Sequence, residues 1–273
     1  MKIVLSLKKK LEKPFDLALL SQFNHKRPTL EVFNKLESLY GTTKVFFNDF
    51  FDVNFFDLDK KKNHFIINGA NKLLKNVGFS WEHDLLEVNG TLGDYLGARM
   101  KSGLIDVRGN CGNFLGCEMQ GGRIQVSKNA GDFVGSPSPS GGNKCGMIGG
   151  EIVIEGNAGE YLGQLMRRGL ILVKGDVKKY CCFHMIAGSV VVGGCIGKDY
   201  SNFMKRGSLI LLTQKVKTSQ NFVEASMGCS SFLNFLTRFL WDNYKLRINK
   251  NSNVKRYVGD RYNHGIGEII YFD

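Results

Sequence analysis

Histidine, serine and acidic side chains are the residues of this 273-residue sequence that could bind a metal ion or attack a substrate. The five histidines lie far apart and form no HxH, HExxH or Cys/His cluster, so no group of neighbouring metal ligands is visible. Serine, histidine and aspartate all occur, but a nucleophile elbow does not. The sequence therefore predicts no catalytic residue and no metal ligand. The histidines are His25, His64, His83, His184 and His264.

The seven cysteines are odd in number and show neither a CxxC pair nor ferredoxin-type spacing. We therefore expect free, buried thiols in a reducing compartment. No run approaches the roughly 18 apolar residues of a membrane span, and the opening MKIVLSLKKKLEKPF lacks the features of a secretory signal. These observations predict a cytoplasmic protein with no membrane partner. The cysteines are Cys111, Cys117, Cys145, Cys181, Cys182, Cys195 and Cys229.

Glycines recur in the pattern G-xx-G-xxx-G, a spacing that invites comparison with phosphate-binding loops. No GK[ST] and no helical pattern follows them, so a phosphate site is not predicted. Glycine at a chain corner instead supplies a positive φ and allows two backbones to approach closely. We assign a structural role to Gly90, Gly93, Gly97, Gly109, Gly112, Gly116, Gly156, Gly159 and Gly163.

These glycines belong to a repeat of 19 residues, in which LLEVNGTLGDYLGARMKSG is followed by LIDVRGNCGNFLGCEMQGG. A fixed period with identical columns means that each unit buries its apolar face by stacking on its neighbours, which is the organisation of a solenoid. One strand per unit and no helical stretch predict a mainly β chain, a right-handed β-helix with coils about 4.8 Å apart. The units start at Leu85, Leu104, Arg123, Glu151, Leu170 and Ser189, and an unfinished unit starts at Ser208.

Four apolar columns run through the repeat, and we expect all of them to point inward. Two of them lie two residues apart and are mostly β-branched, which indicates a strand with one buried face. The third column is aromatic and the fourth is methionine. The columns are Leu86, Ile105, Ile124, Ile152, Ile171, Val190 and Leu209; Val88, Val107, Val126, Ile154, Val173, Val192 and Leu211; Tyr95, Phe114, Phe133, Tyr161 and Tyr180; and Met100, Met119, Met147, Met166, Met185 and Met204.

The residue between the two strand columns should face outward, and its character changes along the chain. It is Glu87, Asp106 and Gln125 in the first units, then Val153, Leu172, Val191 and Ile210. An apolar strip of this length should be covered. We expect the segment 231–244 to form a helix over it, through Phe232, Phe235, Leu236, Phe239 and Leu240. A partner subunit is the alternative cover.

Basic residues precede the glycine that closes several units, and stacking would gather them on one edge. The formal net charge of +12 agrees with a partner or ligand of opposite sign, or with a solvated basic surface. No exposed aromatics interleave with these residues and no nucleic-acid-binding signature occurs, so nucleic acid is not predicted. The candidate contacts to an acidic carrier or partner are Arg167, Arg168, Lys205 and Arg206.

The regions outside the repeat suggest three parts: an N-terminal α/β cap at 1–62, the β-helix at 63–214, and a C-terminal helix and tail at 215–273. MKIVLSL predicts a strand, and TLEVFNKLESLY predicts an amphipathic helix with Thr29 as N-cap. Phe65 to Gly69 should form an irregular first coil. The third unit carries nine extra residues around SPSPSGGNK, and the loop 136–145 is either a contact element or an inert excursion.

The coil pattern G-xx-G-xxx-G-xx-M-xx-G-x-I-x-V resembles the β-helical domain of the glutamate synthase C-terminal-like superfamily. Within it, the chain is similar to the C-type subunit of formylmethanofuran dehydrogenase nearly end to end. The matching segments are VFFNDFFDV near residue 50, the coils, MKRGSLILL at 204–212, and YVGDRYNHGIGEIIYF at 257–272.

This resemblance implies a non-catalytic subunit of a one-carbon transfer complex. The loop SPSPSGGNKCGM favours the bacterial formyltransferase/hydrolase complex of formaldehyde oxidation, in which a formyl group passes from tetrahydromethanopterin to a furan-type carrier and leaves as formate. The alternative is the molybdenum or tungsten dehydrogenase. Catalysis would then lie in larger subunits: a zinc amidohydrolase-like and a formyltransferase subunit, or molybdopterin and iron–sulfur subunits. This chain would bind no cofactor, and its basic edge could hold the carrier's glutamyl tail.

Two other classes of function compete with this one. A self-sufficient enzyme would need titratable side chains converging on one face, and the sequence shows none. A polyanion-binding module would lose affinity steeply as salt rises.

Overall fold

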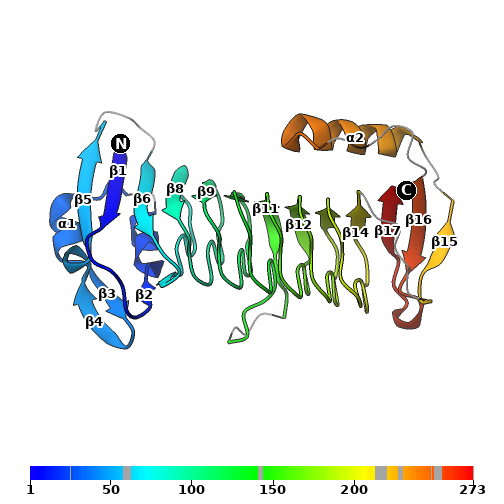
Figure 1. Cartoon of the computed structure of the whole chain (residues 1–273), viewed down its shortest axis with the longest axis horizontal. Helices are drawn as coiled ribbons and strands as arrows, with labels where there is room; N and C mark the ends of the chain where they lie inside the picture. Colours follow the sequence, from blue (N-terminus) through cyan, green and yellow to red (C-terminus); the bar gives the residue numbers. More distant parts are fainter. Residues whose placement is uncertain are drawn as a thin grey trace.

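The computed structural model describes residues 1–24, 26–57, 63–140, 144–212, 220–226, 230–246, 248 and 254–272. The molecule is an elongated row of stacked coils, with a small α/β cap at one end and three strands and a helix at the other (Figure 1). No helix within the described ranges is long and apolar enough to cross a membrane.

One large sheet runs the length of the molecule, with the strand order β15-β16-β17-β14-β13-β12-β11-β10-β9-β8-β6-β1-β5. Its central pairs are parallel and keep the register of the repeat, so that Leu86 lies beside Ile105 and Ile152 beside Ile171. The prediction of a mainly β chain is confirmed, and the large, mostly parallel sheet is consistent with a β-helix-like fold. The coil strands are β8 (Leu85–Gly90), β9 (Leu104–Arg108), β10 (Arg123–Val126), β11 (Ile148–Ile154), β12 (Arg168–Val173), β13 (Ser189–Val192) and β14 (Ser208–Leu211).

The two strand columns and the methionine column form the core of the coils, as expected. Met100 and Met204, at opposite ends of the methionine column, are both fully buried. A polar ladder on the outside also joins the coils: the side-chain amide oxygen of Asn157 accepts from the Asp176 backbone N–H at 2.8 Å, and the Asp176 carboxylate accepts from the Cys195 backbone N–H at 2.7 Å. Each such side chain satisfies a corner N–H of the next coil that would otherwise lack a partner.

The aromatic column does not point inward, contrary to the sequence prediction. Tyr95, Phe114 and the rings after them are half-exposed and stack face to face, with centroids 4.7 to 5.0 Å apart. Tyr95 has a φ of 63°, and this left-handed corner turns its side chain outward while the next residue, Leu96, is buried. The inward column at this corner is therefore Leu96, Leu115, Val134, Leu162 and Cys181.

The corner glycines meet two different demands. Gly97 has a φ of +61°, and Cys182 and Ser201 adopt the same left-handed φ where later coils lack the glycine. Gly159 is needed for space, because a Cβ there would lie 2.0 Å from the Asp132 carboxylate oxygen. Gly116 and Gly163 share the first property; Gly93 and Gly112 share the second, as do Gly109 and Gly156, and Gly90 combines both.

The N-terminal cap extends the large sheet and adds a small one. β1 (Lys2–Leu7) lies between antiparallel β5 (Phe51–Phe56) and parallel β6 (His64–Ala70). β6 pairs in parallel with β8 and is the strand of the expected first coil. The small sheet contains β4 (Thr43–Phe46), β3 (Glu37–Tyr40), β2 (Phe15–Asp16) and β7 (Leu74–Lys75), beside the short helices η1 (Ala18–Phe23) and η2 (Phe47–Asp49).

The amphipathic helix predicted from Thr29 is much shorter than expected. α1 covers only Leu30–Asn34, and the side chain of Thr29 makes no capping hydrogen bond. Phe33, one residue before the end of the helix, packs against the rings of Phe23 and Phe47, and the segment then continues as β3, in which Ser38 pairs with Val45 across the hairpin. Tertiary packing overrides the local helical pattern here.

The C-terminal region contributes strands that the sequence analysis did not predict. β17 (Gly267–Phe272) pairs in parallel with β14, placing Glu268 beside Ser208. β16 (Val254–Gly259) and β15 (Val223–Ala225) follow it as antiparallel strands, and the short helix η3 (Arg261–Asn263) lies between β16 and β17. The coil stack thus ends on a paired strand.

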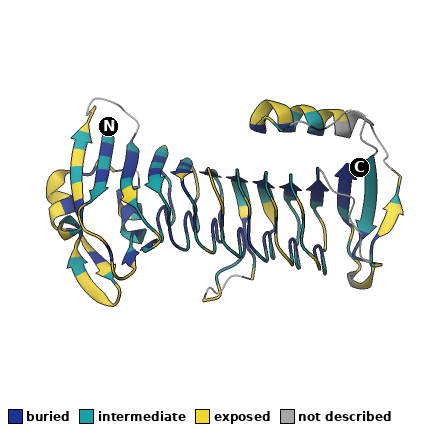
Figure 2. Cartoon of the chain, viewed as in Figure 1, coloured by how far each residue is buried: buried dark blue, intermediate teal, exposed yellow. Residues whose placement is uncertain are grey.

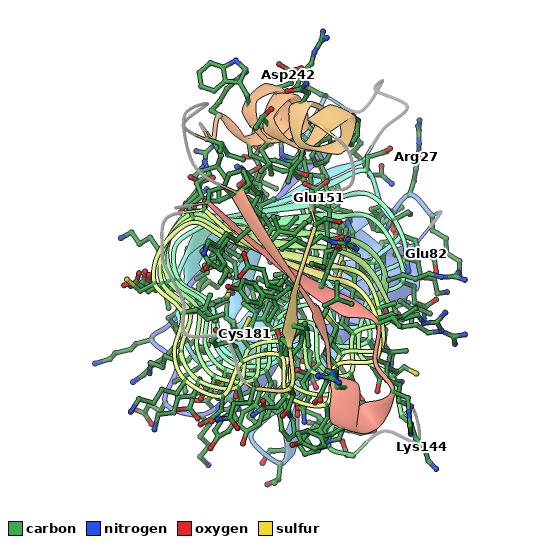
Figure 3. The ribbon with its side chains drawn as sticks, turned by 90° about the vertical axis from the view of Figure 1, so that its right-hand side faces the viewer. Arg27, Glu82, Lys144, Glu151, Cys181 and Asp242 are labelled. Atoms are coloured by element: carbon green, nitrogen blue, oxygen red, sulfur yellow. The ribbon has the colours of Figure 1, made fainter. Side chains whose placement is uncertain are left out.

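The helix α2 (Ser230–Tyr244) covers the apolar strip, as predicted. Leu236 and Leu240 are buried against Leu172 and Val191, whereas Phe235 is 64% exposed and does not take the role expected of it. The side chain of Phe232 lies outside the described residues. The helix buries the side that faces the coils and exposes its outer side (Figure 2), and Figure 3 shows Glu151 between helix and coils with Asp242 on the outer side.

Candidate functional site

Three of the four basic residues predicted to share one edge line a common depression. Arg167, Arg168 and Arg206 line a depression of about 370 Å³ together with Gly169, Ile186, Ala187 and Gly188. Arg206 comes from a unit two coils further along, and Lys205 is not among the lining residues. Stacking therefore assembles three of the four candidates.

The three guanidinium groups of this depression carry a local positive charge. The side chains of Arg167, Arg168 and Arg206 are exposed, and no ion pair within the described part of the chain involves them. A guanidinium group binds carboxylate in a bidentate manner, and groups on separate coils can contact successive carboxylates of one ligand. The residues lining the depression include no carboxylate, histidine or cysteine, so its chemistry is anion binding.

Within the part of the chain that the structure describes, the histidines and acidic residues do not assemble into a metal site. No group of three or more potential ligands occurs among the described residues. His64 lies 3.1 Å from the Glu87 carboxylate, His83 is buried beside Trp81, and the ring of His184 stacks on Phe203 at 4.7 Å. His25 lies outside the described residues.

The cysteines are free where the structure describes them, but not all are buried as expected. Burial raises the pKa of the Cys111 thiol to about 12, and burial followed by the neighbouring Glu118 carboxylate does the same for the pKa of Cys117. These thiols are therefore poor nucleophiles at neutral pH. Cys195 is exposed and Cys145 is partly exposed, while Cys229 lies outside the described residues.

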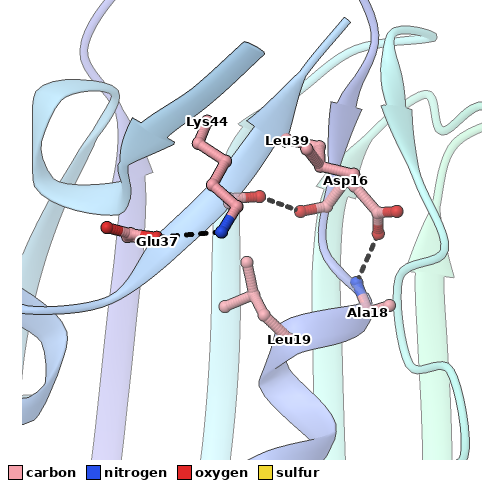
Figure 4. Close-up of a pocket in the computed structure, with 7 residues that line it drawn as sticks. Asp16, Ala18, Leu19, Glu37, Leu39 and Lys44 are labelled. Carbon is pink, nitrogen blue, oxygen red and sulfur yellow. Dashed lines mark hydrogen bonds and ion pairs between the residues drawn. The ribbon is translucent and has the colours of Figure 1, made fainter. Parts of the chain in front are cut away.

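A second depression lies on the N-terminal cap, between η1 and the β3–β4 hairpin (Figure 4). Its polar side chains already have partners within the chain. The Asp16 carboxylate accepts from the Ala18 N–H at 2.8 Å and from the Asn76 amide at 2.9 Å, and Glu37 pairs with Lys44 at 3.7 Å. This depression thus offers no free group for catalysis.

A third depression lies where the insertion loop folds back on the coils. The Ser138 N–H donates to the Glu118 carboxylate at 3.1 Å, and Arg99 pairs with the same carboxylate at 2.8 Å. The loop is therefore tied to the coil surface at Ser138, beside a depression of about 340 Å³ lined by Phe79, Tyr95, Cys117 and Ser140 among others.

The fold and this surface define a class of protein: a coil-stacked chain whose distinguishing chemistry is an arginine-lined edge, without an assembled catalytic group in the described residues. The chain belongs to the GXGXG motif family, whose model matches residues 62–232. A search of curated protein sequences gives no significant match.

The chain is also similar to a chain of the formyltransferase/hydrolase complex (FhcABCD) from Methylorubrum extorquens, whose crystal structure was determined in complex with methylofuran. The TM-score is 0.84 at 27% sequence identity, and the match covers 98% of this chain and 98% of that chain. The resemblance stated from the sequence is thereby confirmed.

Proposed function

We propose that this chain is the non-catalytic, structural C-type subunit of a one-carbon transfer complex of the formyltransferase/hydrolase type. The observation that carries the proposal is the match over 98% of both chains, because it includes the cap and the C-terminal strands as well as the coils. A generic coil-stacked domain would match in the coils alone. We further propose that the coils form a right-handed β-helical scaffold at 63–214, capped by 1–62 and followed by the C-terminal part at 215–273.

The chemistry of the surface supports a scaffold role. The arginine-lined depression can bind carboxylates but contains no general base or nucleophile. Catalysis would lie in partner subunits, a zinc amidohydrolase-like and a formyltransferase subunit, and this chain would organise them in the cytoplasm.

The basic edge would bind the acidic tail of the furan-type carrier. We expect charge reversal of Arg167, Arg168 and Arg206, which line the depression, to weaken carrier binding by the assembled complex at low salt, with a smaller effect at high salt because ions screen exposed charges. Binding is measured by calorimetry. Charge reversal of Lys128 and Lys144, which lie elsewhere on the surface, is the control. Unchanged affinity in this three-residue variant would remove the carrier role while leaving the scaffold role intact.

The proposed function is tested by affinity purification of the tagged chain from its native cells, followed by mass spectrometry and metal analysis. We expect a formyltransferase and an amidohydrolase-like subunit with zinc. Molybdopterin and iron–sulfur subunits would instead assign the chain to the dehydrogenase. A chain that purifies alone and binds heparin in a salt-dependent manner would contradict the scaffold role and favour a polyanion-binding module.

A further inference from the structure

The loop between β16 and β17, residues 260–266, exposes two large apolar side chains at the C-terminal end of the stack. Tyr262 is 79% exposed and Ile266 is 71% exposed, the highest values for large hydrophobic residues in the described part of the chain. The loop projects past the ends of its two strands (Figure 1), and Figure 2 shows it as a largely exposed segment.

Hydrogen bonds hold this loop firmly against the last coil. Asp260 is only 1% exposed, and its carboxylate accepts from the backbone N–H of Phe203 at 3.0 Å and of Tyr262 at 3.1 Å. The Gly265 N–H donates to the Asp260 carbonyl, and the Ile266 N–H donates to the Lys205 carbonyl, both at 2.8 Å. The loop is therefore built as an ordered element of the fold.

Asp260 and Gly265 account for how the loop is fixed to the last coil, but not for its two exposed apolar side chains. Asp260 supplies the hydrogen bonds, and Gly265 is required for space, since a Cβ there would lie 2.2 Å from the Met204 carbonyl oxygen. Neither the side chain of Tyr262 nor that of Ile266 is needed for these contacts. Their exposure on a fixed backbone is what a pre-organised binding surface requires, because little conformational entropy is lost on association.

The charges around the loop indicate the kind of partner. Lys205 and Arg261 flank the two apolar side chains and are exposed, and no ion pair of the described residues includes either of them. Phe203, 43% exposed, extends the apolar surface toward the coils. A partner that fits this surface has an apolar pocket with a rim of carboxylates.

A second copy of this chain fits the surface less well. The formal net charge of +12 makes two copies repel each other, and the same basic residues would face one another across a symmetric contact. A different polypeptide with an acidic surface can supply both the apolar pocket and the surrounding carboxylates.

We propose that the 260–266 loop is the element through which this chain binds an acidic partner subunit, with Tyr262 and Ile266 inserted into an apolar pocket and Lys205 and Arg261 paired with carboxylates around it. This inference rests on the proposed function, since it assumes a partner within the same complex. It assigns the assembly contact to the end of the stack, next to the arginine-lined depression at Lys205 and Arg206 but lined by different side chains.

The proposal is tested by replacing Tyr262 and Ile266 together with serine in the tagged full-length chain, expressed in its native cells. We expect recovery of the partner subunits, quantified by mass spectrometry, to fall at least about tenfold, because exposed aromatic and aliphatic anchors dominate binding energy. The matched control is Phe235→Ser, since Phe235 is 64% exposed but lies on α2. Thermal unfolding of both variants should match that of the unmodified chain, since the replaced side chains are exposed.

A photocrosslinking amino acid at position 262 provides a measurement that does not depend on a variant losing binding. Crosslinks to an acidic segment of a different polypeptide support the proposal. Undiminished recovery of partners with the double serine variant, an absence of crosslinks, or crosslinks only to another copy of this chain would overturn it. A reproducible crosslinked partner that belongs to no one-carbon transfer complex would retain the docking loop and reject the proposed function.

Discussion

The outward-facing strand column differs between the first three coils and the following four, and only the second group is covered by a helix. Glu87, Asp106 and Gln125 are half-exposed, whereas Val153, Leu172, Val191 and Ile210 are buried beneath α2. The backbone register is the same in both regions. The comparison indicates that, where the inward columns and the register are the same, an apolar outward column marks the place where a second layer packs.

Placing a charge in the column should have opposite consequences in the two regions. Leu172→Lys puts an ammonium group at a fully buried position under the helix, and we expect a loss of about 4 kcal/mol in the free energy of unfolding. Gln125→Lys occupies the equivalent half-exposed position and should change that free energy by less than about 0.5 kcal/mol. Urea denaturation measures both. Equal losses would refute the view that α2 creates the difference.

Shortening a buried side chain of α2 should reduce the free energy of unfolding by less than a charge in the strip does. Leu240 is fully buried against the strip, so Leu240→Ala should cost about 3 kcal/mol by leaving a cavity between α2 and the sheet. Phe235→Ala on the exposed side of the same helix should cost less than about 0.5 kcal/mol. Denaturation gives both values, and amide hydrogen exchange reports whether α2 opens by itself. A stable Leu240→Ala variant would mean that the helix adds little to the fold.

The smallest effect is expected at the boundary between the two regions. The Tyr244 hydroxyl donates to the Glu151 carboxylate, and the Arg123 guanidinium lies 5.5 Å from the Tyr244 ring centre. Removing the hydroxyl in Tyr244→Phe should cost about 1 kcal/mol, while Tyr262→Phe, at an exposed ring, should cost nothing measurable.

The same tyrosine predicts a pH dependence. Burial, and then the hydrogen bond to Glu151, raise the pKa of Tyr244 above its ordinary value of 10.0. A raised pKa in the folded state means that this contribution to stability is complete below pH 10 and is lost as pH rises above that value. The Tyr244→Phe variant should therefore lose stability less steeply above pH 10 than the unmodified chain. If stability fell equally steeply with pH in both proteins, the hydrogen bond between Tyr244 and Glu151 would be contradicted.

Much of the coil region could be predicted from the sequence because the repeat multiplies each observation. The alternating strand columns, the methionine column and the apolar strip each recur several times, and each is buried as predicted. The basic edge could be predicted in the same way, since Arg167 and Arg206 occupy corresponding regions of different coils.

The direction of the aromatic column could not be predicted from the repeat. Tyr95 and Leu96 are adjacent and both apolar, so the sequence does not reveal which of them faces the core. The left-handed φ of 63° at Tyr95 makes that choice, and for a residue other than glycine such a conformation leaves little trace in the sequence. The regular spacing of Asn157 and Asp176 was visible, by contrast, and their polar ladder could have been proposed.

The C-terminal region was the hardest to predict because its sequence is not repeated, so no column of equivalent residues supports a prediction. The segment 267–272 is apolar enough for a strand, but its pairing with β14 depends on contacts between residues 60 positions apart, such as Ser208 and Glu268. The loop at 260–266 owes its shape to Asp260, whose partners lie in the last coil. Sequence spacing does not encode such long-range contacts.

Because β14 pairs with β17, the edge of β14 stays unpaired during translation until β17 has been synthesised. The edge of β14 forms around Ser208, and its neighbour around Glu268 is translated 60 residues later, roughly 3 to 12 seconds at ordinary elongation rates. During that interval the newest coil presents an unpaired strand whose spacing suits any coil of the same kind, including one on an adjacent ribosome. Each nascent copy must therefore close its own stack before a neighbour supplies the missing strand.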